Sequence, residues 1–390
     1  MNDSTNTSPR IVSKLPQVGT TIFTVMSNLA AEHKAVNLGQ GFPDFGCDPS
    51  LTGMVNAAMN EGFNQYPPMS GAAPLRTAVS DKIFSLYGRR YHADSEITVT
   101  AGATQALLTS ILCSVHTDEE VIVIEPAFDS YLPAIQLAGG VAVCVPMQLG
   151  ASGYAVDWDK VGAAITPRTR LIMINTPHNP TATVFGAQDM ARLAELVRGT
   201  DILILSDEVY EHMVYDGLPH ESVARHPELA ERSFVVSSFG KTYHVTGWKV
   251  GYVAAPAALT AEFRKVHQFN VFTVNTPMQH GIAAYMAEPR HYRELAAFYQ
   301  AKRDLFRAGL ENTRFKLLPA TGSYFQCVDY SAISDASEAE FATWLTREIG
   351  VAAIPVSAFY RDAKDNGIVR FCFAKKEETL RTALERLARA

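Results

Sequence analysis

The feature that most limits the fold is an alternation of short β-type runs and helical patterns between about residues 96 and 253. Seven β-type runs occur there: EITVTAG, EEVIVIEP, VAVCVPM, TRLIMINTP, DILILSDEVY, SFVVSSF and KVGYVAAP. Several are apolar on both faces, as expected for strands that helices cover from both sides. Helical stretches at residues 104–115 and 188–199 lie between runs. The pattern predicts an α/β fold with a mostly parallel, seven-stranded sheet flanked by helices, whose ligands bind beyond the carboxyl ends of the strands.

The flanking segments predict a second, smaller domain. Apolar residues at 75, 79, 83 and 86 fall on one face of a helix before the sheet. After it, the helical pattern at 291–312 is long enough to link two domains. The remaining chain has the order β-β-α-β-β-α, in the runs RFKLLP, GSYFQCVDY, EAEFATWLTREIG (residues 338–350), VAAIPV, GIVRFCFAK and KEETLRTALERLARA. We therefore expect an N-terminal segment of residues 1–50 that packs with the small domain, a large domain of residues 51–288 and a small α+β domain of residues 289–390.

Charge and composition argue against several partners. The 390-residue chain has 34 Lys and Arg against 40 Asp and Glu, so it lacks the basic surface that binds a nucleic-acid backbone. Its five cysteines show no metal-ligand or redox spacing, which predicts free thiols in a reducing compartment and no metal site. No run approaches the ~20 apolar residues that span a membrane. We expect a cytoplasmic protein that binds neither nucleic acid nor membrane.

Two lysines stand close together in the stretch SSFGKTYHVTGWKVGY, residues 237–252. Lys241 follows a β-type run and has neutral neighbours, so its amine could be partly desolvated, with a lowered pKa suited to forming a Schiff base. The alternative is an ordinary surface lysine. Ser238 and Lys249 flank Lys241 and offer the hydroxyl and the cation that a phosphate group requires.

Two further turns follow strands. The motif TAGATQAL opens a helix, so the amides of Ala103 and Thr104, with the Thr104 hydroxyl, are placed to hold an anion at the helix N-terminus. The same turn is also a common structural connection between a strand and a helix. The rigid turn in NTPHNPTATVF aims Asn175 and Asn179 at the edge of the sheet, although it too has a purely structural interpretation.

Other strand ends carry groups suited to a flat, charged ring. LILSDEVY ends an apolar strand with Asp207 and Glu208, followed by Tyr210. A carboxylate there is costly unless it is paired, and a helix N-cap is the alternative. Phe128, in EPAFDSY, could stack on a ring or belong to the core.

Arg370 lies inside the apolar run GIVRFCFAK. Such an arginine either forms a structural salt bridge or binds an anionic ligand, and its planar fork fits a substrate carboxylate. Each of these residues has a structural alternative when taken alone. Together, an amine nucleophile, a phosphate site, a buried carboxylate, a stacking aromatic ring and a carboxylate fork are the parts that pyridoxal phosphate requires.

The chain resembles class I aminotransferases of the fold-type I pyridoxal-phosphate superfamily, and within them the branch of kynurenine, glutamine and methionine aminotransferases. The matching segments cover nearly the whole chain in the family's order: NLGQGFPDF, NQYPPMSG, TAGATQAL, EPAFDSY, NTPHNPT, SDEVY, SSFGKTYHVTGWKVGY, GSYF and VRFCFAK. The resemblance implies the fold-type I architecture and pyridoxal 5'-phosphate as the cofactor.

It also implies a role for each matching residue. Lys241 would be the catalytic residue, bonding to the cofactor and carrying the proton, and Asp207 would pair with the pyridine nitrogen. The implied cofactor-binding set is Tyr66, Ala103, Thr104, Phe128, Asn179, Asp207, Tyr210, Ser238, Lys241 and Lys249. Tyr66 would come from the other subunit of a homodimer with shared active sites. The implied substrate-binding set is Phe23, Gly41, Asn179 and Arg370.

Three positions depart from the family pattern. Lys249 stands where many relatives have arginine, which keeps the charge and loses the fork. Ala182 replaces the glycine of the usual Asn-Pro-Thr-Gly turn, so the backbone there is expected to differ slightly. Thr104 replaces an aromatic residue of the animal kynurenine enzymes, which favours methionine-type enzymes.

The predicted reaction moves the amino group of methionine, glutamine or an aromatic amino acid, kynurenine included, to a 2-oxo acid by a ping-pong mechanism. No second arginine can be placed for a dicarboxylate side chain. One alternative is a C–S β-lyase that acts on cysteine conjugates with the same cofactor. Another is a regulator that binds the cofactor without turnover, which the presence of Lys241 argues against.

Overall fold

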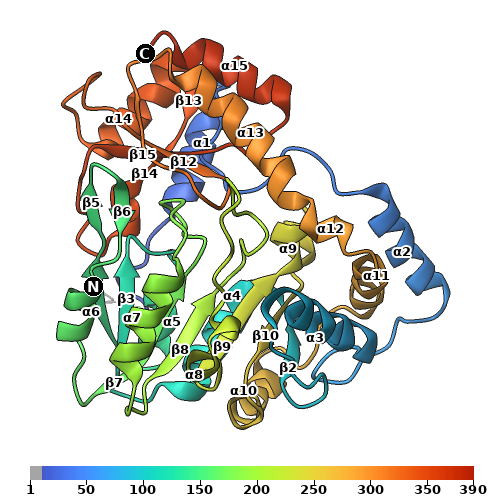
Figure 1. Cartoon of the computed structure of the whole chain (residues 1–390). Coiled ribbons are helices and arrows are strands. Elements are labelled where there is room, and N and C mark those ends of the chain that lie inside the picture. The colour runs from blue at the N-terminus through green and yellow to red at the C-terminus, as the bar shows by residue number, and fades with distance from the viewer. Residues whose placement is uncertain (1–10) are drawn as a thin grey trace, which may run out of the picture.

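The computed structural model describes residues 11–390 and places a seven-stranded sheet at its centre (Figure 1). The strands in spatial order are β2 (Ile97–Thr100), β10 (Gly251–Ala254), β9 (Ser233–Ser238), β8 (Leu203–Asp207), β7 (Thr169–Asn175), β3 (Glu120–Glu125) and β4 (Val141–Pro146). β10 runs antiparallel to both its neighbours, and the other neighbouring pairs are parallel. Each of the seven predicted β-type runs contains one of these strands, which confirms the predicted sheet.

Helices cover both faces of this sheet. Val121 and Val123 of β3 pack with the layer of α4 (Gly102–Ser114), α5 (Tyr131–Leu137) and α10 (Ala257–Asn270). Ile122 and Ile124 pack with the opposite layer, which includes α3 (Ala73–Tyr87), α6 (Trp158–Ala163), α7 (Ala187–Val197) and α11 (Thr276–Met286). Because successive side chains of a strand point to opposite faces, a strand between two helical layers must be apolar throughout. This requirement explains the continuous apolar runs in the sequence.

A four-stranded sheet lies on the carboxyl-end side of the large sheet (Figure 1). Its strands in order are β11 (Lys316–Leu317), β12 (Phe325–Asp329), β15 (Ile368–Cys372) and β14 (Ile354–Pro355). Around it lie α1 (Ile22–Glu32), α13 (Leu295–Leu310), α14 (Glu338–Trp344) and α15 (Glu377–Leu387). The N-terminal strand β1 (Val36–Asn37) pairs in parallel with β13 (Val351–Ala352). Arg370 therefore stands in the middle of β15, on a sheet that faces the carboxyl ends of the large one.

Three predicted elements differ in detail. The helix expected at residues 291–312 is divided into α12 (Arg290–Arg293) and α13. The run VAAIPV forms two short strands, of which β13 pairs with β1 and β14 pairs with β15. The helix expected at 338–350 ends as α14 and continues as a wider turn, η3 (Leu345–Ile349). The division of the chain at residues 50 and 288 stays a prediction.

The remaining elements are short or peripheral. They are α2 (Pro49–Asn60), the hairpin of β5 (Gln148–Gly150) and β6 (Gly153–Ala155), η1 (Val223–Arg225), α8 (Pro227–Ala230), α9 (Phe239–Thr242), η2 (Thr246–Trp248) and η4 (Val356–Phe359). α9 follows directly on β9, so the chain reaches Lys241 within one helical turn of the sheet. No helix within residues 11–390 has both the length and the apolar character needed to cross a membrane.

Candidate active site

One cavity of about 310 Å³ opens between the two sheets, beyond the carboxyl ends of β7, β8 and β9. All but one of the predicted site residues line it: Phe23, Gly41, Ala103, Thr104, Phe128, Asn179, Asp207, Tyr210, Ser238, Lys241, Lys249 and Arg370. The exception is Tyr66, which lies on the surface with 80% of its area exposed. Asn175, which the sequence also placed at the edge of the sheet, lines the cavity as well. Further lining residues were not predicted: Gln40, Phe42, Gly102, Leu107, Val209, Thr246 and Phe325.

The Lys241 amine is held inside this cavity. Its Nζ donates to the carbonyl oxygen of Gly41 at 3.0 Å and to the Tyr324 hydroxyl at 2.8 Å. Burial lowers the pKa of Lys241 to about 8, because the charged ammonium loses its hydration there. The surface-lysine alternative is therefore wrong. An amine with this pKa is in part neutral near pH 7, as a nucleophile must be.

The two adjacent carboxylates at the end of β8 have different surroundings. Asp207 lines the cavity, and burial raises its pKa to about 6 while the Tyr131 hydroxyl, which donates to Oδ2 at 2.7 Å, favours the charged form. The N-cap alternative is wrong, because turns and not a helix follow β8. Asp207 is thus a buried acid that stays mostly ionised at neutral pH, helped first by the Tyr131 hydroxyl and then by the Val209 amide and the Lys241 charge.

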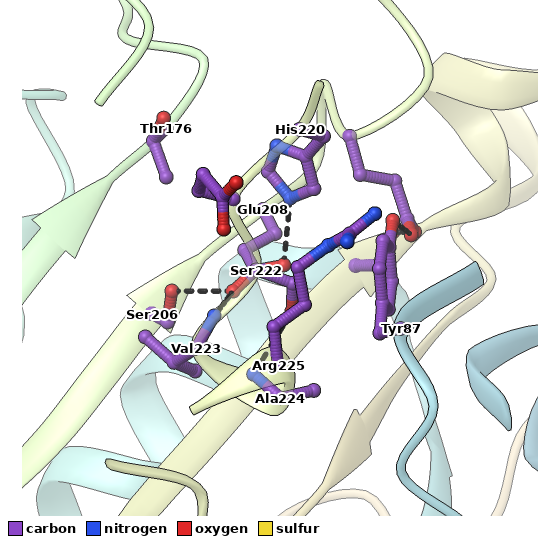
Figure 2. A network of polar contacts seen from close by, with 12 residues as sticks. Tyr87, Thr176, Ser206, Glu208, His220, Ser222, Val223, Ala224 and Arg225 are labelled. Atoms are coloured by element: carbon purple, nitrogen blue, oxygen red, sulfur yellow. Dashed lines mark hydrogen bonds and ion pairs between the residues drawn. The ribbon is translucent and has the colours of Figure 1, made fainter. Parts of the chain in front are cut away.

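Glu208 does not line the cavity, and it belongs to a separate network of polar contacts (Figure 2). Its Oε2 lies 2.8 Å from His220 Nε2, and its Oε1 accepts from the Ser206 hydroxyl at 2.8 Å and from the Val223 amide at 3.2 Å. These contacts join the end of β8 to the segment that carries η1. Glu208 is therefore satisfied within the protein, and Asp207 is the carboxylate available to a ligand.

Arg370 is a buried cation without a carboxylate partner. It is 1% exposed, and no Asp or Glu among residues 11–390 lies within salt-bridge distance of it. Nη1 donates to Asn179 Oδ1 at 2.6 Å and Nη2 to the Gly39 carbonyl at 3.0 Å, while Nε has no hydrogen-bond partner. The guanidinium lies 3.9 Å from the centroid of the Phe325 ring. The salt-bridge alternative is therefore wrong, and a buried, incompletely satisfied fork favours an anionic ligand.

The start of α4 lies beside the end of β9 at the cavity, and its geometry suits an anion. The helix begins at Gly102 with no acidic residue in its first turn, so its free amides and its dipole favour an anion. Gly102 has φ of 73°, and a Cβ built there would lie 3.3 Å from Lys249 Nζ. A Cβ on Gly251 would lie 2.6 Å from the carbonyl oxygen of Ser237. Glycines thus allow the close approach that brings the Lys249 cation to the helix start.

The Asn-Pro turn connects these groups. Asn175 Nδ2 donates to the Asp207 carbonyl at 2.8 Å, and its Oδ1 accepts from the Asn179 amide at 2.7 Å. The Asn179 side chain then reaches Arg370, as described above. Ala182 has φ of 61°, so alanine adopts here the left-handed conformation that glycine favours. The replacement of glycine by alanine therefore leaves the backbone at residue 182 in the left-handed region.

Two tyrosines of the site were not assigned from the sequence. Tyr324 contacts Lys241 Nζ and the Gly41 carbonyl, and Tyr131 contacts Asp207. Tyr131 also packs edge-on against Phe128, with ring centroids 5.8 Å apart. Phe128 therefore lines the cavity and packs on the core at once. Tyr131 lies in the motif EPAFDSY and Tyr324 in GSYF, so membership of these two matching segments was the sequence signal that could have identified them.

Fold and site together define a fold-type I α/β enzyme. The chain belongs to the class I and II aminotransferases, whose family model matches residues 33–387. Members of this family use pyridoxal phosphate, and they take amino acids and 2-oxo acids as substrates.

Relatives of known name match along almost the full chain. The chain is 51% identical to methionine aminotransferase of Escherichia coli K12, over 96% of this chain and 97% of that protein. It is 39% identical to a probable N-succinyldiaminopimelate aminotransferase of Mycobacterium tuberculosis, over 97% and 98%. It is 34% identical to kynurenine–oxoglutarate transaminase of Dictyostelium discoideum, over 95% and 94%.

Solved structures agree. A crystal structure described as a methionine aminotransferase from Escherichia coli superposes with a TM-score of 0.96 at 50% identity, covering 98% of this chain and all of that one. The chain is therefore an aminotransferase. The relatives named here give no support to the C–S β-lyase alternative, and the non-catalytic regulator is excluded by the same family assignment.

Proposed function

We propose that this aminotransferase takes the amino group from methionine, glutamine or an aromatic amino acid and passes it to a 2-oxo acid through pyridoxal phosphate bound in the cavity. The observation that carries the proposal is that a buried, unpaired Arg370 and a partly neutral Lys241 line one cavity. Arg370 would bind the substrate α-carboxylate, and Lys241 would bond to the aldehyde of the cofactor. Transamination of an α-amino acid needs both groups.

The cavity residues fit the cofactor group by group. The Asp207 carboxylate would pair with the ring nitrogen, and Phe128 would stack on the ring. Asn179 and Tyr210 would donate to its phenolic oxygen. Ala103 and Thr104 at the start of α4, with Ser238 of β9 and Lys249, would hold the phosphate. Bound in this way, the cofactor supplies an electron sink for the charge left on the substrate Cα.

Lys241 and Arg370 divide the work on the substrate. Arg370, with Asn179 and the Gly41 backbone, fixes the α-carboxylate and so places Cα near Lys241 Nζ. Lys241 would hold the cofactor, and its amine, when free, would accept the proton that leaves Cα. The same residues act in reverse order on the 2-oxo acid, so ping-pong kinetics are expected.

The lining of the cavity favours donors with neutral side chains. Phe23, Phe42, Leu107 and Phe325 are apolar, and within residues 11–390 Arg370 is the one arginine that lines the cavity. A dicarboxylate donor needs a second cation for its side chain. Methionine is supported further by the 51% identical relative, and kynurenine by the 34% identical one.

A homodimer completes the proposal. Tyr66 packs edge-on against Phe272 with ring centroids 5.3 Å apart, and Phe269 is 90% exposed. Large exposed aromatic side chains gathered on one face favour an interface. In the proposed dimer Tyr66 reaches the phosphate site of the partner subunit. The large and small domains at 51–288 and 289–390, and a cytoplasmic location, remain part of this proposal.

A spectrum of the purified, cofactor-loaded protein tests the function. The visible band of the cofactor should disappear when L-methionine is added and return when a 2-oxo acid follows, because the amino group is first stored and then released. The control is L-aspartate, which should change the band far less at equal concentration. A band that responds to neither amino acid contradicts the proposed donor class.

Tyr131→Phe tests the pairing of Asp207 with the cofactor. In the wild type, cofactor affinity measured by fluorescence titration should fall as the pH drops through about 6, the pKa of Asp207, because the protonated acid cannot pair with a cationic ring nitrogen. The variant loses a donor that favours the carboxylate, so the midpoint should rise by about one pH unit. Equal midpoints in the two proteins would show that Tyr131 does not act through Asp207.

A further inference from the structure

The loop of residues 39–42 forms one wall of the cavity, and two functional cations bind its backbone. The Gly41 carbonyl accepts from Lys241 Nζ at 3.0 Å and from the Tyr324 hydroxyl. The Gly39 carbonyl accepts from Arg370 Nη2 at 3.0 Å. The position of this loop therefore decides where both cations point.

Lys375 binds the same loop from outside the cavity. It follows β15 by three residues, is 4% exposed, and donates from Nζ to the Phe42 carbonyl at 2.7 Å and to the Gln40 carbonyl at 3.3 Å. No carboxylate in the described part of the chain lies within salt-bridge distance of it. A buried ammonium without a counter-ion is expensive, so the backbone carbonyls are what makes this position tolerable.

The contacts of the loop differ in how long they last during turnover. Once Lys241 Nζ bonds to the cofactor it has fewer hydrogens to donate, so the Gly41 carbonyl loses a partner. A substrate carboxylate at Arg370 competes with the Gly39 carbonyl for the same guanidinium. The two hydrogen bonds from Lys375 involve neither ligand, and they hold the carbonyls on either side of Gly41 throughout.

We propose that Lys375 is a positioning residue that holds the 39–42 loop at the cavity. It does so while Lys241 and Arg370 give up their hydrogen bonds to this loop and bind the cofactor and the substrate instead. This inference rests on the proposed aminotransferase function of the cavity. In this inference Lys375 raises the affinity for the substrate through the loop and does not contact the cofactor. Removal of the Lys375 amine should leave cofactor binding unchanged and weaken the binding of the amino acid.

Lys375→Met is the test, because it keeps the length of the side chain and removes both donors. The KM for L-methionine should rise by about tenfold or more, as for the loss of hydrogen bonds from a charged donor. Cofactor affinity and the visible spectrum of the loaded protein should match the wild type. Lys375→Arg, which keeps a charged donor, should show a smaller rise in KM than Lys375→Met.

The matched control is Lys376→Met. Lys376 is the next residue, and its side chain is 53% exposed, so its loss should leave KM unchanged. If Lys375→Met does not fold, Lys375→Gln takes its place, since an amide can still donate to one carbonyl. A wild-type KM in a folded Lys375 variant overturns the inference, as does a fall in melting temperature without a change in KM. A wild type whose spectrum ignores L-methionine instead refutes the underlying function.

Discussion

Replacing Lys241 with alanine is expected to lower the rate of transamination by about 1000-fold or more, because the variant loses both its nucleophile and its proton carrier. Nothing nearby can take over. Lys249, the other lysine that lines the cavity, lies beside the start of α4, where its Nζ approaches Gly102. The rate is measured as the exchange between L-methionine and a 2-oxo acid, with cofactor at saturation.

A second measurement on Lys241 does not depend on turnover. Borohydride treatment of the cofactor-loaded wild type should fix the cofactor to the peptide that contains Lys241, and mass spectrometry should find no such product in Lys241→Ala. Tyr324→Phe serves as a control, since it removes a hydrogen bond to the same amine and keeps the nucleophile. A fully active alanine variant, or a label on another lysine of the wild type, contradicts the proposed mechanism.

The large sheet was predictable because its strands, apart from the edge strand β4, are buried on both faces. A run such as VIVI in β3 has no polar face, so it fits a sheet between two helical layers and few other places. The small sheet was harder. VAAIPV is one apolar run, yet Ala353 separates β13 from β14 and sends them to different partners. Pairing between segments far apart in the chain decides that division, and local pattern carries no trace of it.

The site was predictable where a residue type is costly in its surroundings. Arg370 inside an apolar strand, and Asp207 at the end of another, each require a partner, so the sequence alone raised the question of what binds them. Which of Asp207 and Glu208 faces a ligand was not decided by that argument. The difference comes from His220, twelve residues away, which lies against Glu208 alone.

Lys375 and Tyr324 were missed for a related reason. Their functional partners are backbone carbonyls of residues 40–42, and every residue has such a carbonyl, so no pattern of side chains marks the contact. Only the arrangement of the loop beside β15 and β12 brings these donors to it. Contacts from a side chain to a distant backbone are the part of an active site that sequence patterns reveal least.

Arg370→Met is expected to raise the KM for the amino acid by about 100-fold, with a smaller change in kcat. The reason is that the buried guanidinium offers two or more donors to the α-carboxylate, and each charge-assisted hydrogen bond is worth about 1.5–3 kcal/mol. The KM for the 2-oxo acid should rise in parallel, because the two substrates share the carboxylate. Arg370→Lys keeps the charge and loses the fork, so its KM should lie between those of the wild type and Arg370→Met.

Arg303 provides a control that separates binding from stability. It is also buried, at 6% exposed, but it forms a two-point ion pair with Asp216, whose carboxylate accepts at 2.6 Å from both Nη atoms. Arg303→Met should therefore lower the free energy of unfolding by about 1–3 kcal/mol and leave KM unchanged. Arg370→Met removes a buried charge that has no partner, so unfolding should be affected much less. If Arg370→Met instead loses stability as Arg303→Met does and keeps its KM, Arg370 is a structural residue and the carboxylate must bind elsewhere.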